Sequence, residues 1–316
     1  MIIPLVVLAG AVALAWLAIA KGRSTEAFRR ITVPAELVDS ARHARRAFVR
    51  RIALAALAAA ALGSVAAALS DSAPASYGLV PLLAPGIATL ACLVVIAALP
   101  GVPVPEAGAK RSADLAARRA WTFAPAWSWA LPAVTGTLLL AAVTVLGLTS
   151  WPQEDGLFRA VHVESGDYAS TAGPYPGWFY GLPVAALAIA VAVAAYVALA
   201  RVAASARPTD PALREVDRVM RIVTSRVIMK LTAGTFAAYL GALLFAAGTS
   251  LTSAAGQWHN GAYSEIEPWT TLGMVELFAG LAVLVGGLAL IVLAVIDAVK
   301  PPFTVQVAEP AVAAAP

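Results

Sequence analysis

Residues 172–200 read AGPYPGWFYGLPVAALAIAVAVAAYVALA, a turn-rich aromatic segment followed at once by an apolar run. The prolines and glycines of residues 172–183 disfavour a helix through that part. Tyr and Trp rings are enriched where a bilayer meets water. The run at 181–200 carries no charge and is about as long as a membrane-crossing helix must be. The stretch therefore predicts a membrane surface followed by a transmembrane helix.

The composition of the whole chain agrees with this interpretation. Of its 316 residues, 60% are hydrophobic and only 13% are charged, and the mean hydropathy is +0.81. Soluble domains carry about 25% charged residues, and a single water-soluble core could not hide this much apolar surface. The excess must face lipid. Cys92 is the only cysteine, so no intramolecular disulfide can form.

Seven apolar runs are long enough to cross a bilayer as helices. They cover about residues 2–20, 52–69, 79–99, 130–149, 181–200, 231–251 and 270–297. The sequence therefore predicts an all-α fold, in which residues 1–300 form one bundle of seven transmembrane helices and residues 301–316 a disordered cytoplasmic tail. Glycines within these runs, among them Gly241, Gly280, Gly286 and Gly287, would let helices pack closely.

The basic residues predict the orientation. Of the 22 Lys and Arg residues, 21 lie in segments 21–51, 100–129 and 201–230 or at Lys300, and only Arg159 lies on the other side. Cytoplasmic loops carry such an excess, so we expect the N-terminus outside and the C-terminus inside. No basic segment precedes the run at 2–20, so we expect a retained span rather than a cleaved signal peptide. Its removal would leave six spans and the same inner side.

Two of the inner segments have the pattern of amphipathic helices. In residues 34–51, apolar side chains including Leu37 and Phe48 share one face, and arginines form another. Residues 208–230 repeat this plan. Two roles remain open: the basic residues bind anionic lipid headgroups, or the helices dock a cytoplasmic or membrane protein partner. The candidate contact residues are Arg42, Arg46, Arg50, Arg118, Arg119, Arg218 and Arg221.

Glu276 is the acidic residue that lies well inside a predicted span. Seven residues from the outer end of the last run correspond to a depth of about 10 Å at 1.5 Å per residue. A carboxyl group at that depth is a functional candidate, with either a structural role or a role in binding a proton or substrate. Asp297, at the inner end beside Lys300, is expected to be solvated.

The two predicted outer loops are acidic and aromatic. Their candidate residues are His162, Glu164, Asp167, Trp178, Trp258, His259 and Trp269. His and carboxylate groups can bind a divalent metal, but no spacing here is typical of a ligand set, so we expect no metal. The other interpretations are a solvated loop surface and an aromatic and acidic pocket for a cationic ligand.

Several activities are disfavoured by the residues that the chain lacks. No histidine lies in a predicted span, as bis-histidine haem ligation would require. The last span has no lysine before its inner end for a retinal Schiff base. Walker A, HExxH and GxSxG motifs are missing from the sequence. We therefore expect no enzyme activity, no cofactor and no nucleic-acid binding.

The segment PYPGWFYGLP before a span, together with LREVDRVMRIVTSR at 213–226, resembles multi-pass membrane proteins of alanine-rich actinobacteria to which no activity is assigned. The resemblance implies a bacterial plasma-membrane protein. Two functional hypotheses follow from the sequence. The first is a non-enzymatic accessory, sensor or scaffold component. The second is a transporter or permease subunit for a weakly polar or hydrophobic solute, with Glu276 near its path.

Overall fold

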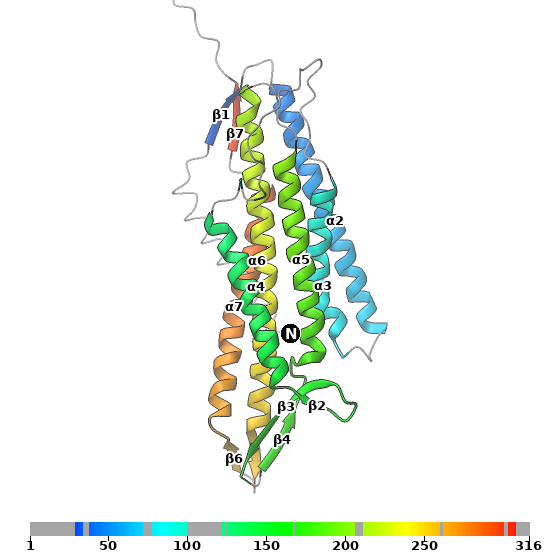
Figure 1. The fold of residues 1–316 in the computed structure, drawn as a ribbon, viewed down its shortest axis with the longest axis vertical. Helices are drawn as coiled ribbons and strands as arrows, with labels where there is room; N and C mark the ends of the chain where they lie inside the picture. The colour runs from blue at the N-terminus through cyan, green and yellow to red at the C-terminus, as the bar shows by residue number, and fades with distance from the viewer. Residues whose placement is uncertain are drawn as a thin grey trace, which may run out of the picture.

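The computed structural model describes residues 29–33, 38–72, 77–99, 120, 122–123, 126–166, 168–205, 211–259, 262–299 and 303–307, and it is mostly helical (Figure 1). The described helices are α2 (Val38–Ser72), α3 (Leu79–Ala98), α4 (Ala126–Leu148), α5 (Trp178–Ala204), α6 (Pro211–Ala255) and α7 (Trp269–Val299). Short strands lie at the two ends of the bundle.

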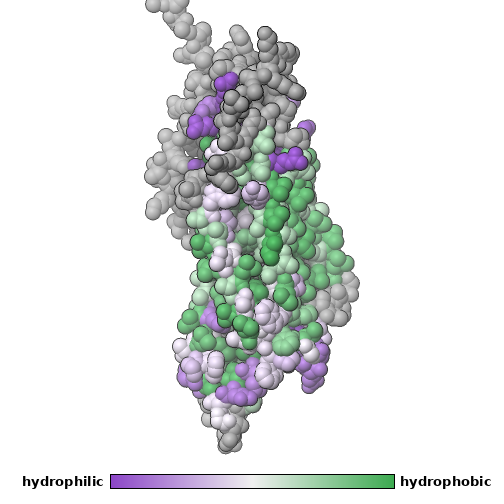
Figure 2. All heavy atoms as spheres, viewed as in Figure 1, coloured by the Kyte–Doolittle hydropathy of each residue, from purple (hydrophilic) through white to green (hydrophobic). Residues whose placement is uncertain are grey.

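Six helical stretches of the described chain are long and apolar enough to cross a membrane. They are Arg45–Ala66, Leu79–Ala98, Ser128–Leu148, Trp178–Ala204, Leu213–Ala255 and Trp269–Val299. These stretches correspond to the second to seventh predicted spans, and the predicted span at 2–20 lies outside the described residues. On the face shown in Figure 2, apolar residues cover the middle of the described part, whereas its hydrophilic residues gather toward the ends. This distribution indicates a membrane-embedded protein.

Two of the helices are much longer than a bilayer requires. At 1.5 Å per residue, the 45 residues of α6 extend over about 68 Å, against a hydrocarbon thickness of about 30 Å. From Pro211 on, the amphipathic segment predicted at 208–230 therefore continues without a break into the span at 231–251. The same holds for α2, whose 35 residues join the basic segment to the second span.

Helix α6 lies at the centre of the bundle. It contacts α7, α4 and α5, while α3 packs between α2 and α5. In its most apolar stretch, 72% of α6 is buried within the protein, against 11% for α2. Helix α2 therefore presents most of its apolar surface, including Leu57 and Val65, away from the other described helices.

Helices α6 and α7 meet along a line of three glycine pairs, which we call the glycine seam. Gly234 faces Gly287, Gly241 faces Gly280 and Gly248 faces Gly273. A Cβ atom added to the α6 member of each pair would lie 2.8, 2.7 and 2.5 Å from the carbonyl oxygen of its partner. The two backbones are thus in direct contact, as small residues allow.

The strands form small sheets at the two ends of the bundle. One end, which we call the hairpin end, carries β2 (Trp151–Pro152), β3 (Phe158–Ser165) and β4 (Tyr168–Ala172), and a hairpin of β5 (Gly256–His259) and β6 (Ala262–Glu265). The opposite end, which we call the basic end, carries β1 (Arg29–Val33) and β7 (Phe303–Val307), which pair in parallel (Figure 1).

These strands were not predicted. The turn between β3 and β4 uses Gly166 at φ +59, a left-handed conformation that glycine adopts readily. Strand β7 occupies residues 303–307 of the segment that was expected to be a disordered tail. The molecule is therefore a helical bundle with short sheets at both ends, rather than purely α-helical.

Candidate functional site

Glu276 lies on α7, seven residues from the start of the helix and between the glycine pairs at Gly273 and Gly280. Its side chain is half-buried, and its Oε2 atom is buried with no hydrogen-bond partner among the described residues. A buried carboxylate oxygen without a partner is unfavourable. Glu276 is thus an acidic side chain of the described spans that internal contacts leave incompletely satisfied.

The electrostatic neighbour of Glu276 is Tyr175, in the segment before α5. Burial raises the pKa of the Tyr175 hydroxyl, and the charge of Glu276 raises it further, while a hydrogen bond with Thr149 acts in the opposite direction. The Tyr175 hydroxyl lies 2.7 Å from Thr149 Oγ1, just beyond α4. The Ser250 hydroxyl on α6 donates to the carbonyl oxygen of Pro174 at 2.7 Å. Residues 174–175 therefore connect the ends of α4 and α6 close to Glu276.

A second set of polar contacts in the spans surrounds Pro85, which lies inside α3. Proline has no N–H and interrupts the helical hydrogen bonds around it. The N–H of Gly86 instead donates to the Tyr239 hydroxyl at 2.9 Å, and this hydroxyl donates to the carbonyl oxygen of Leu83 at 3.1 Å. One turn further, Thr89 and Thr235 share a hydrogen bond of 2.9 Å. These hydrogen bonds connect α3 to α6.

A third polar contact joins α6 and α7 toward the basic end. Lys230 Nζ donates to Asp297 Oδ2 at 2.6 Å, and the two side chains are only 23% and 27% exposed. Asp297 is thus an interhelical ion-pair partner and not the solvated terminus that the sequence suggested. Breaking such a pair leaves an uncompensated charge in a region of low dielectric constant.

Among the predicted outer-loop candidates, His162 and Glu164 lie together at the hairpin end. His162 Nε2 is 2.8 Å from Glu164 Oε1, and its Nδ1 is 2.9 Å from Thr171 Oγ1. The ring of Trp151 stacks on the imidazole at 4.8 Å. Within the described ranges, no three His, Cys, Asp or Glu residues are grouped as metal ligands would be. Asp167 lies outside those ranges.

The predicted tryptophans lie on different elements. Trp178 begins α5 and packs against α4, where a Cβ atom added to Gly147 would lie 2.6 Å from its ring. Trp269 begins α7 and is partly exposed. Trp258 and His259 belong to β5, where their backbones pair with Tyr263 and Ala262.

At the basic end, the candidate arginines differ in their surroundings. Arg42, Arg46 and Arg50 on α2 are exposed, and so is Arg218 on α6. Arg118 and Arg119 lie outside the described residues. Arg221, in contrast, is buried: it donates to Asp217 Oδ2 at 2.8 Å and to the carbonyl oxygen of Val202 at the end of α5, also at 2.8 Å. Arg221 is therefore a structural residue rather than a lipid or partner contact.

The apolar faces of the two basic helical segments are also occupied from within the chain. Phe48 of α2 packs in one buried cluster with Leu213, Val216 and Val223 of α6 and with Ala294 of α7. Of the surface predicted for a partner in these segments, the arginine side of α2 and Arg218 of α6 remain exposed.

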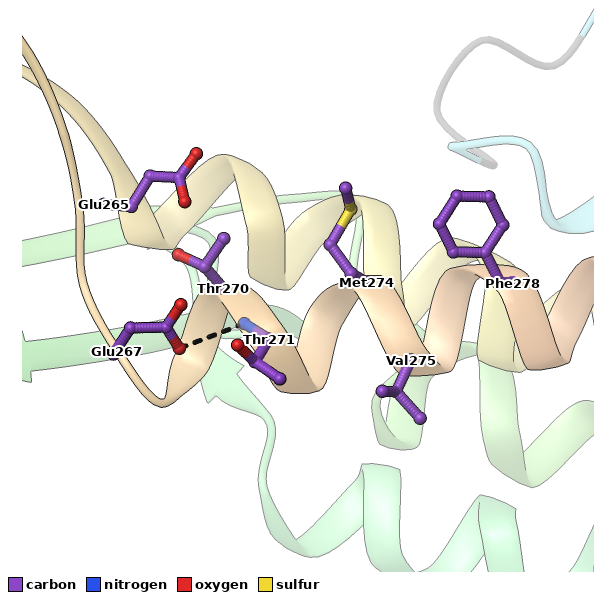
Figure 3. Close-up of a pocket in the computed structure, with 7 residues that line it drawn as sticks. All are labelled: Glu265, Glu267, Thr270, Thr271, Met274, Val275 and Phe278. Atoms are coloured by element: carbon purple, nitrogen blue, oxygen red, sulfur yellow. Dashed lines mark hydrogen bonds between the residues drawn. The ribbon is translucent and has the colours of Figure 1, made fainter.

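A groove runs along α7 at the hairpin end, with a volume of about 530 Å³ (Figure 3). Its polar part holds the carboxylates of Glu265 and Glu267, with Thr270 and Thr271 beside them. The backbone N–H of Thr271 donates to Glu267 Oε2 at 3.3 Å. Its apolar part is made by Met274, Val275 and Phe278. Glu265 and Glu267 belong to the acidic outer loop predicted from the sequence. Met274, Val275 and Phe278 were not predicted as site residues, because they belong to an ordinary apolar span.

Comparison of the chain with protein-family models, curated proteins and solved structures finds no match.

Proposed function

We propose that this protein is a non-enzymatic scaffold or accessory component of a bacterial plasma membrane. The observation that carries the proposal is that polar side chains in the spans form hydrogen bonds or an ion pair with a neighbouring helix. Tyr239 with the α3 backbone, Thr89 with Thr235, and Lys230 with Asp297 each join two helices. Residues used in this way stabilise a bundle, whereas those of a transport path must be available to a solute.

The proposal includes an orientation with the basic end in the cytoplasm and seven spans, residues 2–20 being the first. The concentration of Lys and Arg at that end supports it. Labelling of single cysteines introduced at Gly166 and at Gln306, in a C92A background, should give outside and inside accessibility respectively. Labelling of both positions from the same side of intact cells would contradict the orientation.

The exposed arginine side of α2 is the surface through which a partner would bind in this proposal. The experiment is purification in mild detergent followed by mass spectrometry of the proteins retained. The variant R42S/R46S/R50S should lose a retained partner, while R201S, which removes an exposed arginine at the end of α5, should keep it. Equal retention of a partner by R42S/R46S/R50S and R201S would contradict this role. So would the lack of any retained partner with the parent protein.

One observation favours transport as a second candidate function. Glu276 Oε2 is buried without a hydrogen-bond partner among the described residues, about 10 Å from the start of α7. An unsatisfied carboxyl group at such a depth suits a residue that binds a proton or a polar solute transiently. E276Q should then abolish uptake or export while the protein still inserts and folds. An E276Q protein that transports as the parent does would exclude this role.

A further inference from the structure

The groove on α7 is polar at one end and apolar along the rest, as a membrane lipid is. Its two carboxylates lie before the first residue of the helix, and its threonines lie in the first turn. Met274 to Phe278 follow at depths of roughly 8 to 14 Å along the helix axis. The groove therefore offers polar groups at headgroup level and apolar ones at the level of the acyl chains.

The apolar part of this groove is open to a ligand from the surrounding membrane. Val275 and Phe278 are each 60% exposed. The glycine seam turns the opposite face of α7 toward α6, which leaves this face uncovered by the other described helices. A volume of about 530 Å³ lies within the roughly 300–1,000 Å³ typical of small-molecule sites.

The net negative charge of the hairpin end favours a ligand that carries a positive charge. The segments at 150–180 and 252–269 hold six carboxylates and one basic residue, Arg159. Arg159 donates to Asp155 at 2.7 Å and lies over the Tyr77 ring at 3.8 Å. It is thus engaged with Asp155 and Tyr77, so Glu265 and Glu267 favour a cationic group from outside the chain.

From this complementarity, we infer that the groove on α7 binds a phospholipid with a primary ammonium headgroup, whose ammonium lies at Glu265 and Glu267 and whose acyl chain lies along Met274, Val275 and Phe278. The ligand is an aminophospholipid of the bilayer. Its phosphate lies level with Thr270 and Thr271, in the first turn of α7.

The inference is tested with the full chain in mild detergent, by native mass spectrometry after addition of phosphatidylethanolamine or phosphatidylglycerol with identical acyl chains. The parent protein should retain phosphatidylethanolamine about threefold to tenfold more than phosphatidylglycerol, as expected for one or two partly screened ion pairs. In E265Q/E267Q the two lipids should be retained equally. Gln keeps an oxygen that can accept the Thr271 N–H, so helix capping is preserved.

Two control variants separate the groove from general surface charge. E154Q/E164Q removes the same number of carboxylates at the hairpin end but outside the groove, and it should keep the preference. V275W should reduce retention of both lipids by filling the apolar part. If E265Q/E267Q does not fold, the single variant E265Q should show a reduced preference. Equal retention by the parent protein, or an equal loss of preference in E154Q/E164Q, would overturn the inference.

Discussion

The glycine seam gives a prediction that two adjacent residues can test. Gly287 faces α6, where an added Cβ atom would lie 2.5 Å from the backbone nitrogen of Ala238 and 2.8 Å from the carbonyl oxygen of Gly234. An added Cβ atom on Gly286 would have no atom within 4 Å. Both residues lie in the interior of the same helix. Replacing either with alanine therefore changes intrinsic helix propensity by the same amount, about 1 kcal/mol in favour of alanine.

The difference between G287A and G286A thus isolates the packing term. Contacts below 3 Å with backbone atoms cannot be relieved by a side-chain rotation, so α6 and α7 must move apart along the seam. Overpacking of this kind typically costs about 1–3 kcal/mol. We expect G286A to be as stable as the parent protein or up to about 1 kcal/mol more stable, and G287A to be about 1–3 kcal/mol less stable than G286A.

The measurement is the free energy of unfolding of purified protein in mixed micelles with increasing SDS, followed by circular dichroism. G241A provides an independent repeat, because its added Cβ atom would meet the backbone of Leu284 and lie 2.7 Å from the carbonyl oxygen of Gly280. If G287A and G241A unfold at the same SDS fraction as G286A, the two helices are not in backbone contact and the described seam is wrong.

Three further predictions concern the polar contacts. K230M and D297L should each destabilise the protein by roughly 2 kcal/mol or more, while the double variant should recover part of this loss in a double-mutant cycle. Y239F should lower the free energy of unfolding by about 1–2 kcal/mol, whereas Y196F, at an exposed hydroxyl on α5, should be neutral in the same assay. The hydrogen bond from Arg159 lowers the pKa of Asp155, so the stability that this carboxylate provides is present above its ordinary pKa of about 4 and is lost as the pH falls through the lowered value. Acid unfolding of D155N should therefore be less steep below pH ~4 than that of the parent protein.

The sequence predicted the helices that hydropathy alone can define. The runs from 52–69 to 270–297 each correspond to a helix of the structure, and the amphipathic segments at 34–51 and 208–230 were expected to be helical. The boundaries differed where aromatic residues preceded a span: α5 begins at Trp178, so that Pro183 lies inside the helix, where it has no N–H to donate to the preceding turn. Hydropathy measures the tendency of a segment to leave water, so it does not determine which faces meet.

The candidate site was predictable only where burial of a charge was itself the signal. Glu276 was identified because a carboxyl group is unfavourable in an apolar run. Arg221 was assigned to the surface along with Arg218, because both belong to one basic helical segment and periodicity does not show which arginine faces α5. The pairing of Lys230 with Asp297 joins residues 67 positions apart. Such a contact depends on the antiparallel register of α6 and α7, which neither residue indicates alone.

That register was nevertheless present in the sequence as a spacing. Gly234, Gly241 and Gly248 recur every seven residues on α6, and their partners on α7 recur with the same period in the opposite direction. A seven-residue repeat keeps one face of a helix toward its neighbour, so two such repeats in consecutive spans predict an antiparallel pair. In a chain this rich in alanine, small residues in general carry no information. Glycine differs, because at these six positions a single methyl group would collide with a neighbouring atom, and in all but Gly273 the nearest such atom lies in the partner backbone.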